Sequence, residues 1–271
     1  MSISADIDGF ITSLATTHPD RAFNQYAIGG DNESDNEVRR NNLRLYLGDM
    51  ASRQVDTLLV GEAPGYQGSR QTGVPFMSEF IMLEGISEID MFGEAKSYAK
   101  SAEFPDKIWK EPSATIVWGA MRNVVKVPLI WAAFPFHPFG DTDLSNRAPT
   151  RAELEVGKPF LQEIIRLFKV TKIIAVGNQA KSSLDSLGYD VPKIRHPSHG
   201  AVSYTHLAGC PYLQILDQEI VSETGSPQNA LPARQLAAER IASCQGPTKR
   251  VVTGRRCVSV SRCGADPDTT F

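Results

Sequence analysis

The pattern of apolar and polar positions predicts a run of alternating strands and helices between about residues 56 and 200. Four segments are short, apolar and bounded by turn residues, which is typical of strands buried in a parallel sheet. They are residues 56–60 (DTLLV), 127–136 (VPLIWAAFPF), 171–177 (TKIIAVG) and a short strand that ends at His196. We therefore expect four strands that belong to one sheet.

Helical spacing of apolar residues predicts helices between these strands, and two of them carry clear boundary signals. Thr150 with Glu153 three residues later is a capping-box pattern, and this helix is expected to run to about Phe168. Gly188 is the expected closing residue of the next helix. The other helices are expected at 36–50, at 78–86 and from Ser113 onward, and residues 93–112 are expected to form a surface excursion anchored by Trp109.

The alternation of strands and helices predicts a three-layer α/β/α fold with a four-stranded, mostly parallel sheet. We place this domain at residues 1–210, with residues 56–200 carrying the pattern. Beyond Gly200 the periodicity fades, so residues 211–245 are expected to form a C-terminal helical extension, with a helix at 232–244. Residues 246–271 are polar and rich in turn residues, which predicts a disordered tail.

Composition and charge narrow the class of protein. The 271 residues are 41% hydrophobic and 22% charged, as in ordinary globular proteins, and the net charge of −3 excludes a generally basic nucleic-acid binder while allowing a local basic cleft. No apolar run of membrane-spanning length and no leader pattern is present, so we expect a cytoplasmic monomer that contacts no membrane. The four cysteines, Cys210, Cys244, Cys257 and Cys263, have no metal-binding spacing.

The carboxyl ends of the strands are where an open α/β sheet binds its ligand. Residues that follow the predicted strands are Glu62, then Phe134, Phe136 and His137, then Gly177 and Asn178, then His196, Ser198 and His199. The phosphate-binding pattern GxxxxGK[ST], the order GxGxxG and the nucleophile pattern GxSxG are all absent. A metal held by Glu62 and the histidines is disfavoured, because two histidines on one turn give poor ligand geometry.

General-base and electrostatic chemistry on a flat ligand is what these residues support. Glu62 can hold or activate a water molecule, Phe76 can stack on a ring, and His196 can donate a hydrogen bond to a developing anion. Each residue taken alone also has an ordinary structural explanation, as a loop cap, a core ring or a partner of a backbone carbonyl.

Two motifs in this order resemble the signatures of the uracil-DNA glycosylase superfamily. They are GEAPG at 61–65 with GVPF eight residues later, and RHPSHG at 195–200; the segments WAAFPFHP and NRAPTRAEL resemble the region between them. The pair is most similar to the bacterial branch of the superfamily. The resemblance implies a base-excision DNA repair enzyme that flips a damaged base, such as uracil or another deaminated base, and hydrolyses its N-glycosidic bond without a metal or other cofactor.

The resemblance also implies roles for individual residues. Glu62 matches the water-binding position, Phe76 the ring that stacks on the flipped base, and His196 the imidazole beside the base O2. The base pocket would be lined by Ala63, Pro64, Gly65, Phe76 and Ala132, and DNA phosphates would be contacted by Ser198, Ser69 and Arg70.

Three departures from the family pattern bear on the substrate, the cofactor and the DNA contact. Ala132 stands where relatives carry an asparagine that reads the uracil edge, and the cysteines that hold the iron–sulfur cluster of the thermophilic branch are missing. In relatives an apolar residue after the second motif wedges into the DNA; here the candidates are Tyr204 and Leu207. We therefore expect a glycosylase with altered uracil selectivity that acts on DNA, with no protein partner indicated by any motif.

Two alternatives stay open at this point. The chain could be a catalytically weak member of the same fold that binds damaged or single-stranded nucleic acid. The absence of an amide side chain at Ala132 favours this hypothesis. It could also be a hydrolase of a nucleoside-sized metabolite. Lysine and arginine residues around the strand ends would favour DNA over a metabolite.

Overall fold

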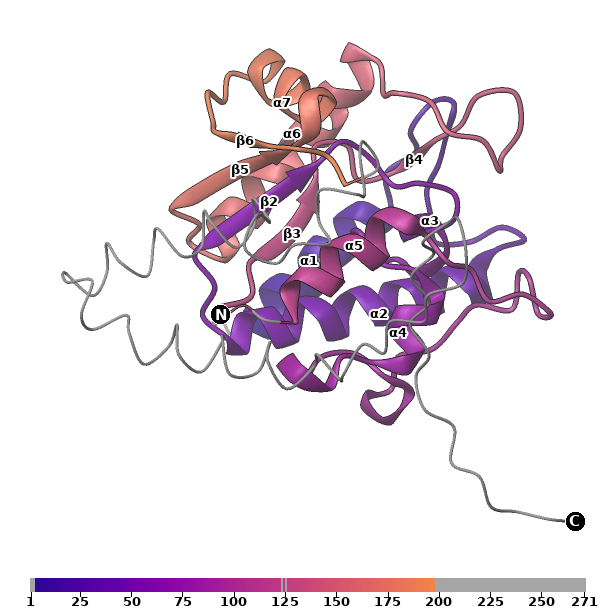
Figure 1. The fold of residues 1–271 in the computed structure, drawn as a ribbon. Helices are drawn as coiled ribbons and strands as arrows, with labels where there is room; N and C mark the ends of the chain where they lie inside the picture. The colour runs from indigo at the N-terminus through magenta and orange to yellow at the C-terminus, as the bar shows by residue number, and fades with distance from the viewer. Residues whose placement is uncertain (1–2, 123, 125, 198–271) are drawn as a thin grey trace, which may run out of the picture. The chain divides into compact units, whose positions relative to one another are not determined.

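The computed structural model describes residues 3–122, 124 and 126–197, and its centre is a four-stranded sheet (Figure 1). The strands lie in the order β3-β2-β5-β6, and every neighbouring pair is parallel. They are β2 (Thr57–Gly61), β3 (Leu129–Ala132), β5 (Lys172–Val176) and β6 (Lys193–Ile194). The predicted three-layer α/β architecture is confirmed.

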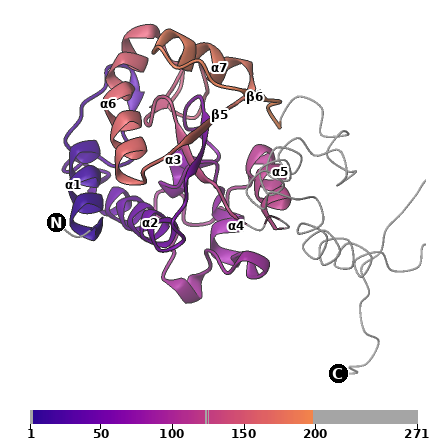
Figure 2. The ribbon, with the colours of Figure 1, turned by 90° about the vertical axis from the view of Figure 1, so that its left-hand side faces the viewer.

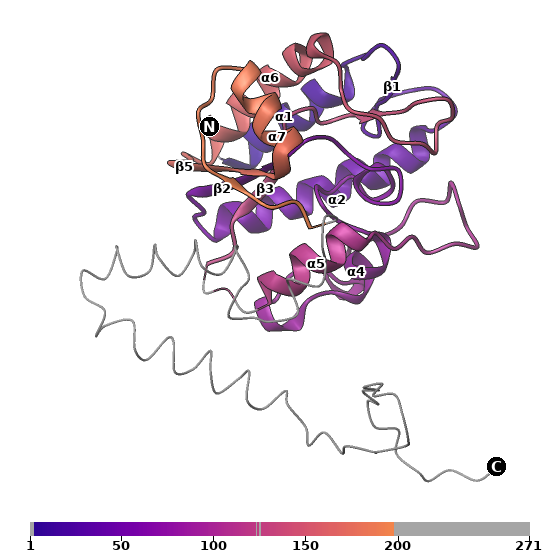
Figure 3. The ribbon, with the colours of Figure 1, turned by 45° about the horizontal axis from the view of Figure 1, so that its top comes forward.

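Helices cover both faces of this sheet. The helices α1 (Ile3–Ala15) and α6 (Arg151–Leu167) lie on one side, and α4 (Glu79–Glu84) and α5 (Pro112–Met121) lie on the other (Figures 2 and 3). The remaining elements are α2 (Glu33–Ser52), α3 (Ser69–Thr72), α7 (Gly177–Ser186), two short 3₁₀ helices (Ser87–Ile89 and Glu94–Lys96) and the antiparallel pair β1 (Ala22–Phe23) and β4 (His137–Pro138).

Local sequence signals explain several of these boundaries. The capping box of α6 is confirmed: the Glu153 amide donates to the Thr150 hydroxyl at 3.3 Å, and the Thr150 amide donates to the Glu153 carboxylate at 2.7 Å. The expected end of α7 is also confirmed, because Gly188 has a φ of +90°, which glycine adopts without strain. Trp109 is buried between the rings of Tyr66 and Phe104, so it anchors its loop as expected.

The second strand is shorter than the apolar run predicts. The assigned strand ends at Ala132 rather than continuing to residue 136. Ala133 and Phe134 still donate to the carbonyl oxygens of Gly61 and Glu62, at 2.9 and 3.0 Å. Pro135 then has no amide hydrogen with which to extend the ladder. The apolar residues beyond the strand are nevertheless buried. The apolar run therefore predicts core residues correctly but overestimates the length of the strand.

Six elements have no counterpart in the sequence-based expectations: α1, α3, the two 3₁₀ helices and the pair β1 and β4. Other expectations lie outside the described residues. These are the helix at 232–244, the extension at 211–245, the tail at 246–271 and all four cysteines.

Candidate active site at the carboxyl ends of the strands

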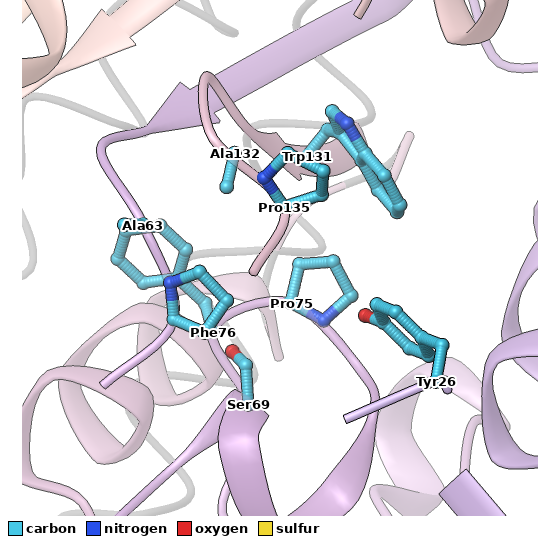
Figure 4. Close-up of a pocket in the computed structure, with 9 residues that line it drawn as sticks. Tyr26, Ala63, Ser69, Pro75, Phe76, Trp131, Ala132 and Pro135 are labelled. Atoms are coloured by element: carbon cyan, nitrogen blue, oxygen red, sulfur yellow. The ribbon is translucent and has the colours of Figure 1, made fainter. Parts of the chain in front are cut away.

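A small, largely apolar cavity opens where β2 and β3 end. It is lined by Tyr26, Ala63, Pro64, Ser69, Pro75, Phe76, Trp131, Ala132 and Pro135 (Figure 4). Gly61 and Ala132 are the last paired residues of the two strands, so the residues that follow Gly61 form one wall and Ala132 another. The space between these walls, open mouth included, is about 290 Å³. The apolar side chains and the Phe76 ring suit contact with one flat heterocyclic ring.

Phe76 stands at this cavity in an unusual backbone conformation. Its φ of +50° lies in the left-handed region, which is costly for an aromatic residue and is often found at functional sites. The Trp118 indole N–H donates to the Phe76 carbonyl at 2.8 Å and fixes this turn. The ring lies against Gly61, where a Cβ atom would come within 2.7 Å of Phe76 Cζ and still closer to Cε2. Only glycine at position 61 leaves room for this ring.

A second, wider cavity lies across the ends of β2, β5 and β6. It is lined by Glu62, Val176, Gly177, Asn178, Gln179, Ala180, Arg195 and His196. Glu62 faces this cavity while its neighbour Ala63 faces the first, so the two cavities lie on either side of one short segment. The His196 ring is 6.2 Å from the Phe76 ring, centroid to centroid. Phe76 is therefore close to both.

Glu62 and His196 owe their placement to the strand ends. Glu62 directly follows β2 and is half-buried, and burial raises the pKa of its carboxyl above the ordinary value. His196 follows β6 and packs on Gly177, which has a φ of +92° and where a Cβ atom would lie 2.7 Å from His196 Cβ. The raised pKa makes Glu62 a stronger base than an exposed glutamate, while its burial limits access of bulk water.

The structure brings most of the predicted site residues together. Glu62 and His196 share the second cavity, whereas Ala63, Pro64, Phe76 and Ala132 line the first. Gly65 lines neither cavity. A Cβ atom at this position would instead lie 3.4 Å from the carboxylate of Glu111, which has no charged partner among the described residues and whose pKa burial raises to about 7.

The three residues expected to contact phosphates have different placements. Ser69 is buried and lines the first cavity, with its hydroxyl directed into the cavity (Figure 4). Arg70 is buried as well: its guanidinium donates to both oxygens of Glu103, at 2.8 and 3.1 Å, and lies 4.2 Å above the ring of Phe23. The Arg70 guanidinium is therefore engaged within the fold, which argues against the expected contact with DNA phosphates. Ser198 lies outside the described residues.

Several lining residues were not among those predicted. Trp131 and Pro135 flank Ala132 in the same segment, so their proximity to the pocket could have been inferred from that alignment. Tyr26 has no such signal, because it comes from a loop more than thirty residues before the first motif. Gln179 and Arg195 adjoin the strand-end residues Asn178 and His196, and they add polar and positive groups to the second cavity.

The described part of the chain offers no group of three histidine, cysteine, aspartate or glutamate side chains that could hold a metal ion. Within the same residues, no helix combines the length and the apolar character needed to cross a membrane.

The fold and the two cavities define an α/β protein with an apolar pocket beside a carboxylate and an imidazole. The family model described as the uracil DNA glycosylase superfamily matches residues 48–229, which is more than half of the chain. The chain belongs to this superfamily, whose members are glycosylase-type hydrolases acting on DNA. No curated protein matches the chain.

Proposed function

We propose that this protein is a DNA repair glycosylase that takes a damaged, deaminated base into the first cavity and hydrolyses its N-glycosidic bond from the second. One observation carries the proposal. An apolar pocket with a strained phenylalanine adjoins a cavity that holds both Glu62 and His196. A base in the first cavity places its sugar toward the second, where positive charge on the sugar and negative charge on the leaving base can both be stabilised.

Base flipping supplies the first requirement of the mechanism. Taking a base out of the duplex costs a few kcal/mol, and stacking on an aromatic ring offsets about 1–3 kcal/mol of that cost. Phe76 is suited to this role because Gly61 and the Trp118 hydrogen bond hold its ring in place before the base arrives. The cost of flipping is smallest for a mispaired base, which favours damaged sites.

Glu62 and His196 supply the second requirement. Departure of the base leaves an oxocarbenium-like sugar, which an ionised Glu62 stabilises while it orients the attacking water. The His196 imidazole stabilises the departing base by a hydrogen bond to its O2. Because burial raises the pKa of Glu62, its ionised form is poorly solvated in the empty site and gains most from a positive charge nearby.

Ala132 is the basis for proposing an altered base preference. Its methyl group points into the cavity and offers no hydrogen bond to the edge of a base (Figure 4). Among the other lining side chains the Tyr26 hydroxyl is already donating to the Gly73 carbonyl at 2.9 Å. Without a side-chain amide that forms two hydrogen bonds to the edge of the base, a pocket cannot strongly discriminate uracil from other bases. We therefore propose that other deaminated bases are accepted as well.

The surroundings of the second cavity favour DNA over a neutral metabolite. Arg195 contributes positive charge, and α7 begins at Gly177 with its amide ends toward the cavity. The amino end of a helix carries partial positive charge that suits a phosphate group. We propose that Asn178 and Arg195, together with Ser198, contact the DNA backbone around the flipped nucleotide.

Excision assays test the proposal directly. Single- and double-stranded oligonucleotides carrying uracil, hypoxanthine, xanthine or a mismatched thymine are incubated with enzyme and then cleaved at abasic sites with alkali. We expect cleavage of at least one substrate, and its loss in Glu62→Ala and His196→Ala. Tight binding of lesion DNA without any excision would instead support the catalytically weak, DNA-binding alternative.

A further inference from the structure

Four buried side chains hold the backbone of the first cavity by donating to its carbonyl oxygens. Tyr26 donates to Gly73, Trp118 to Phe76, Gln25 to Pro135 and a ring nitrogen of His137 to Pro64, at 2.8–2.9 Å. Two of these four carbonyls belong to prolines that line the cavity. Proline has no amide hydrogen, so its carbonyl is the only backbone group through which a neighbour can fix it.

His137 has the most constrained position of the four. It belongs to β4, is completely buried, and has a backbone carbonyl oxygen facing each ring nitrogen. Nδ1 lies 2.8 Å from the Pro64 oxygen, and Nε2 lies 3.2 Å from the Asp143 oxygen. Carbonyl oxygens only accept, so each contact needs a proton on that nitrogen. A neutral imidazole has only one proton to place.

The shorter contact identifies where that proton lies. Burial, opposed by the two carbonyl contacts and assisted by the positive charge of Arg70, lowers the pKa of His137 and favours the neutral ring. A neutral ring with its proton on Nδ1 donates to the Pro64 carbonyl oxygen. Nε2 then carries no proton and forms no hydrogen bond with the more distant Asp143 oxygen. The opposite tautomer would leave the Pro64 carbonyl buried without a partner, at the closer distance.

We infer that His137 is a positioning residue for the base pocket, which fixes the Pro64 wall by donating its Nδ1 proton to the Pro64 carbonyl. This inference rests on the proposed function, because the pocket wall matters for catalysis only if a base enters the cavity. His137 is not among the residues that line either cavity. It acts through the spacing between Pro64 and the residues on the opposite wall, and so through the orientation of the base relative to the water held by Glu62.

Two amide variants separate the two ring contacts. In His137→Asn the amide nitrogen stands near the position of Nδ1 and can still donate to Pro64. In His137→Gln the amide nitrogen stands near the position of Nε2 and can reach only Asp143. Asparagine is one methylene smaller than glutamine and leaves the larger cavity at this buried position, so faster excision by His137→Asn than by His137→Gln reports the held carbonyl and not the filled volume.

Single-turnover excision on the best lesion substrate gives the first readout. We expect His137→Asn to stay within about threefold of wild type and His137→Gln to lose about tenfold or more in the excision rate constant, with little change in the Kd for lesion DNA. Equal loss in both variants, or loss only in Kd, would overturn the positioning role. Thermal unfolding of the two proteins checks that the comparison is between folded variants.

Nitrogen-15 spectra of the histidine rings give a readout that needs no activity. We expect the shifts of His137 to show a protonated Nδ1 and an unprotonated Nε2 at neutral pH, and the amide shifts of residues 63–65 to move more in His137→Gln than in His137→Asn. A proton on Nε2 instead would refute the inference on its own. A wild type that excises no base while showing the expected tautomer would refute the proposed function and leave the Pro64 contact intact.

Discussion

Replacing Gly61 with alanine is the sharpest perturbation of the base-stacking position. Gly61 ends β2, its φ is not in the left-handed region, and alanine suits a strand at least as well, so the backbone itself tolerates the change. The obstacle is Phe76, because the new methyl group would lie within 2.7 Å of Phe76 Cζ and closer to Cε2. The substitution therefore acts on the ring alone.

The size of the effect follows from this overlap. Carbon atoms pack best at about 3.5–4.0 Å, so the ring must move by roughly 1 Å or turn away from the strand. Overpacking of this kind costs about 1–3 kcal/mol of folding stability. A displacement of about 1 Å at a substrate-positioning group can lower the rate of the chemical step by about a hundredfold. We expect Gly61→Ala to lose about thirtyfold to a hundredfold in the excision rate constant.

Single-turnover excision and thermal unfolding measure these two effects separately. Gly48→Ala is the matched control, because Gly48 lies in α2 with open space around its Cα and should gain up to about 1 kcal/mol of stability with unchanged excision. In the double variant Gly61→Ala/Phe76→Leu the smaller side chain should recover stability while excision stays low. Full excision by Gly61→Ala would refute the assigned position of the ring.

Three further predictions concern the charge on Glu62, the ion pair of Arg70 and the identity of residue 132. Because burial raises the pKa of Glu62 and catalysis needs its ionised form, excision should fall as pH decreases through a value above the ordinary glutamate pKa of 4.5, as a pH–rate profile will show. An acid with a raised pKa in the folded state destabilises the protein as pH rises past its unfolded pKa, so Glu62→Gln should raise the unfolding temperature at pH 7 while slowing excision at least a hundredfold. Arg70→Ala removes two hydrogen bonds to Glu103, which keeps its ion pair with Arg39, and should cost about 2 kcal/mol of stability in denaturant titrations, yet leave the salt dependence of DNA binding unchanged. Ala132→Asn should raise uracil excision about tenfold relative to hypoxanthine excision in a competition assay; an unchanged ratio would show that residue 132 does not face the base edge.

Local signals were sufficient for the elements that place the site. The apolar run before Gly61 predicted β2, the capping box at Thr150 predicted the start of α6, and the strand ends located Glu62 and His196. Apolar residues at helical spacing in the first fifteen positions also indicate α1, although no helix was predicted there. The pairing of β1 with β4 could not be predicted, because each strand has only two residues and they are more than a hundred positions apart.

Contacts between distant segments explain what the sequence could not provide. Arg70 looks like a phosphate-binding residue in its motif, but its partner Glu103 comes from a loop 33 residues later and its aromatic neighbour Phe23 from β1. In the sequence His137 cannot be distinguished from the other histidines near strand ends. The structure shows the carbonyl oxygens of Pro64 and Asp143 facing its two ring nitrogens. The residue type indicates which chemistry a side chain can perform. Its hydrogen-bond or ion-pair partner is determined by the tertiary fold.

The most direct test of the proposed mechanism separates binding from chemistry at Glu62. The measurement is the single-turnover rate of base release from lesion-containing DNA, together with the Kd for the same DNA, for wild type, Glu62→Gln and the exposed-residue control Glu155→Gln. We expect Glu62→Gln to slow base release at least a hundredfold with a Kd within about threefold of wild type, and Glu155→Gln to change neither quantity. Equal rates of base release in wild type and Glu62→Gln would contradict the role of this carboxylate.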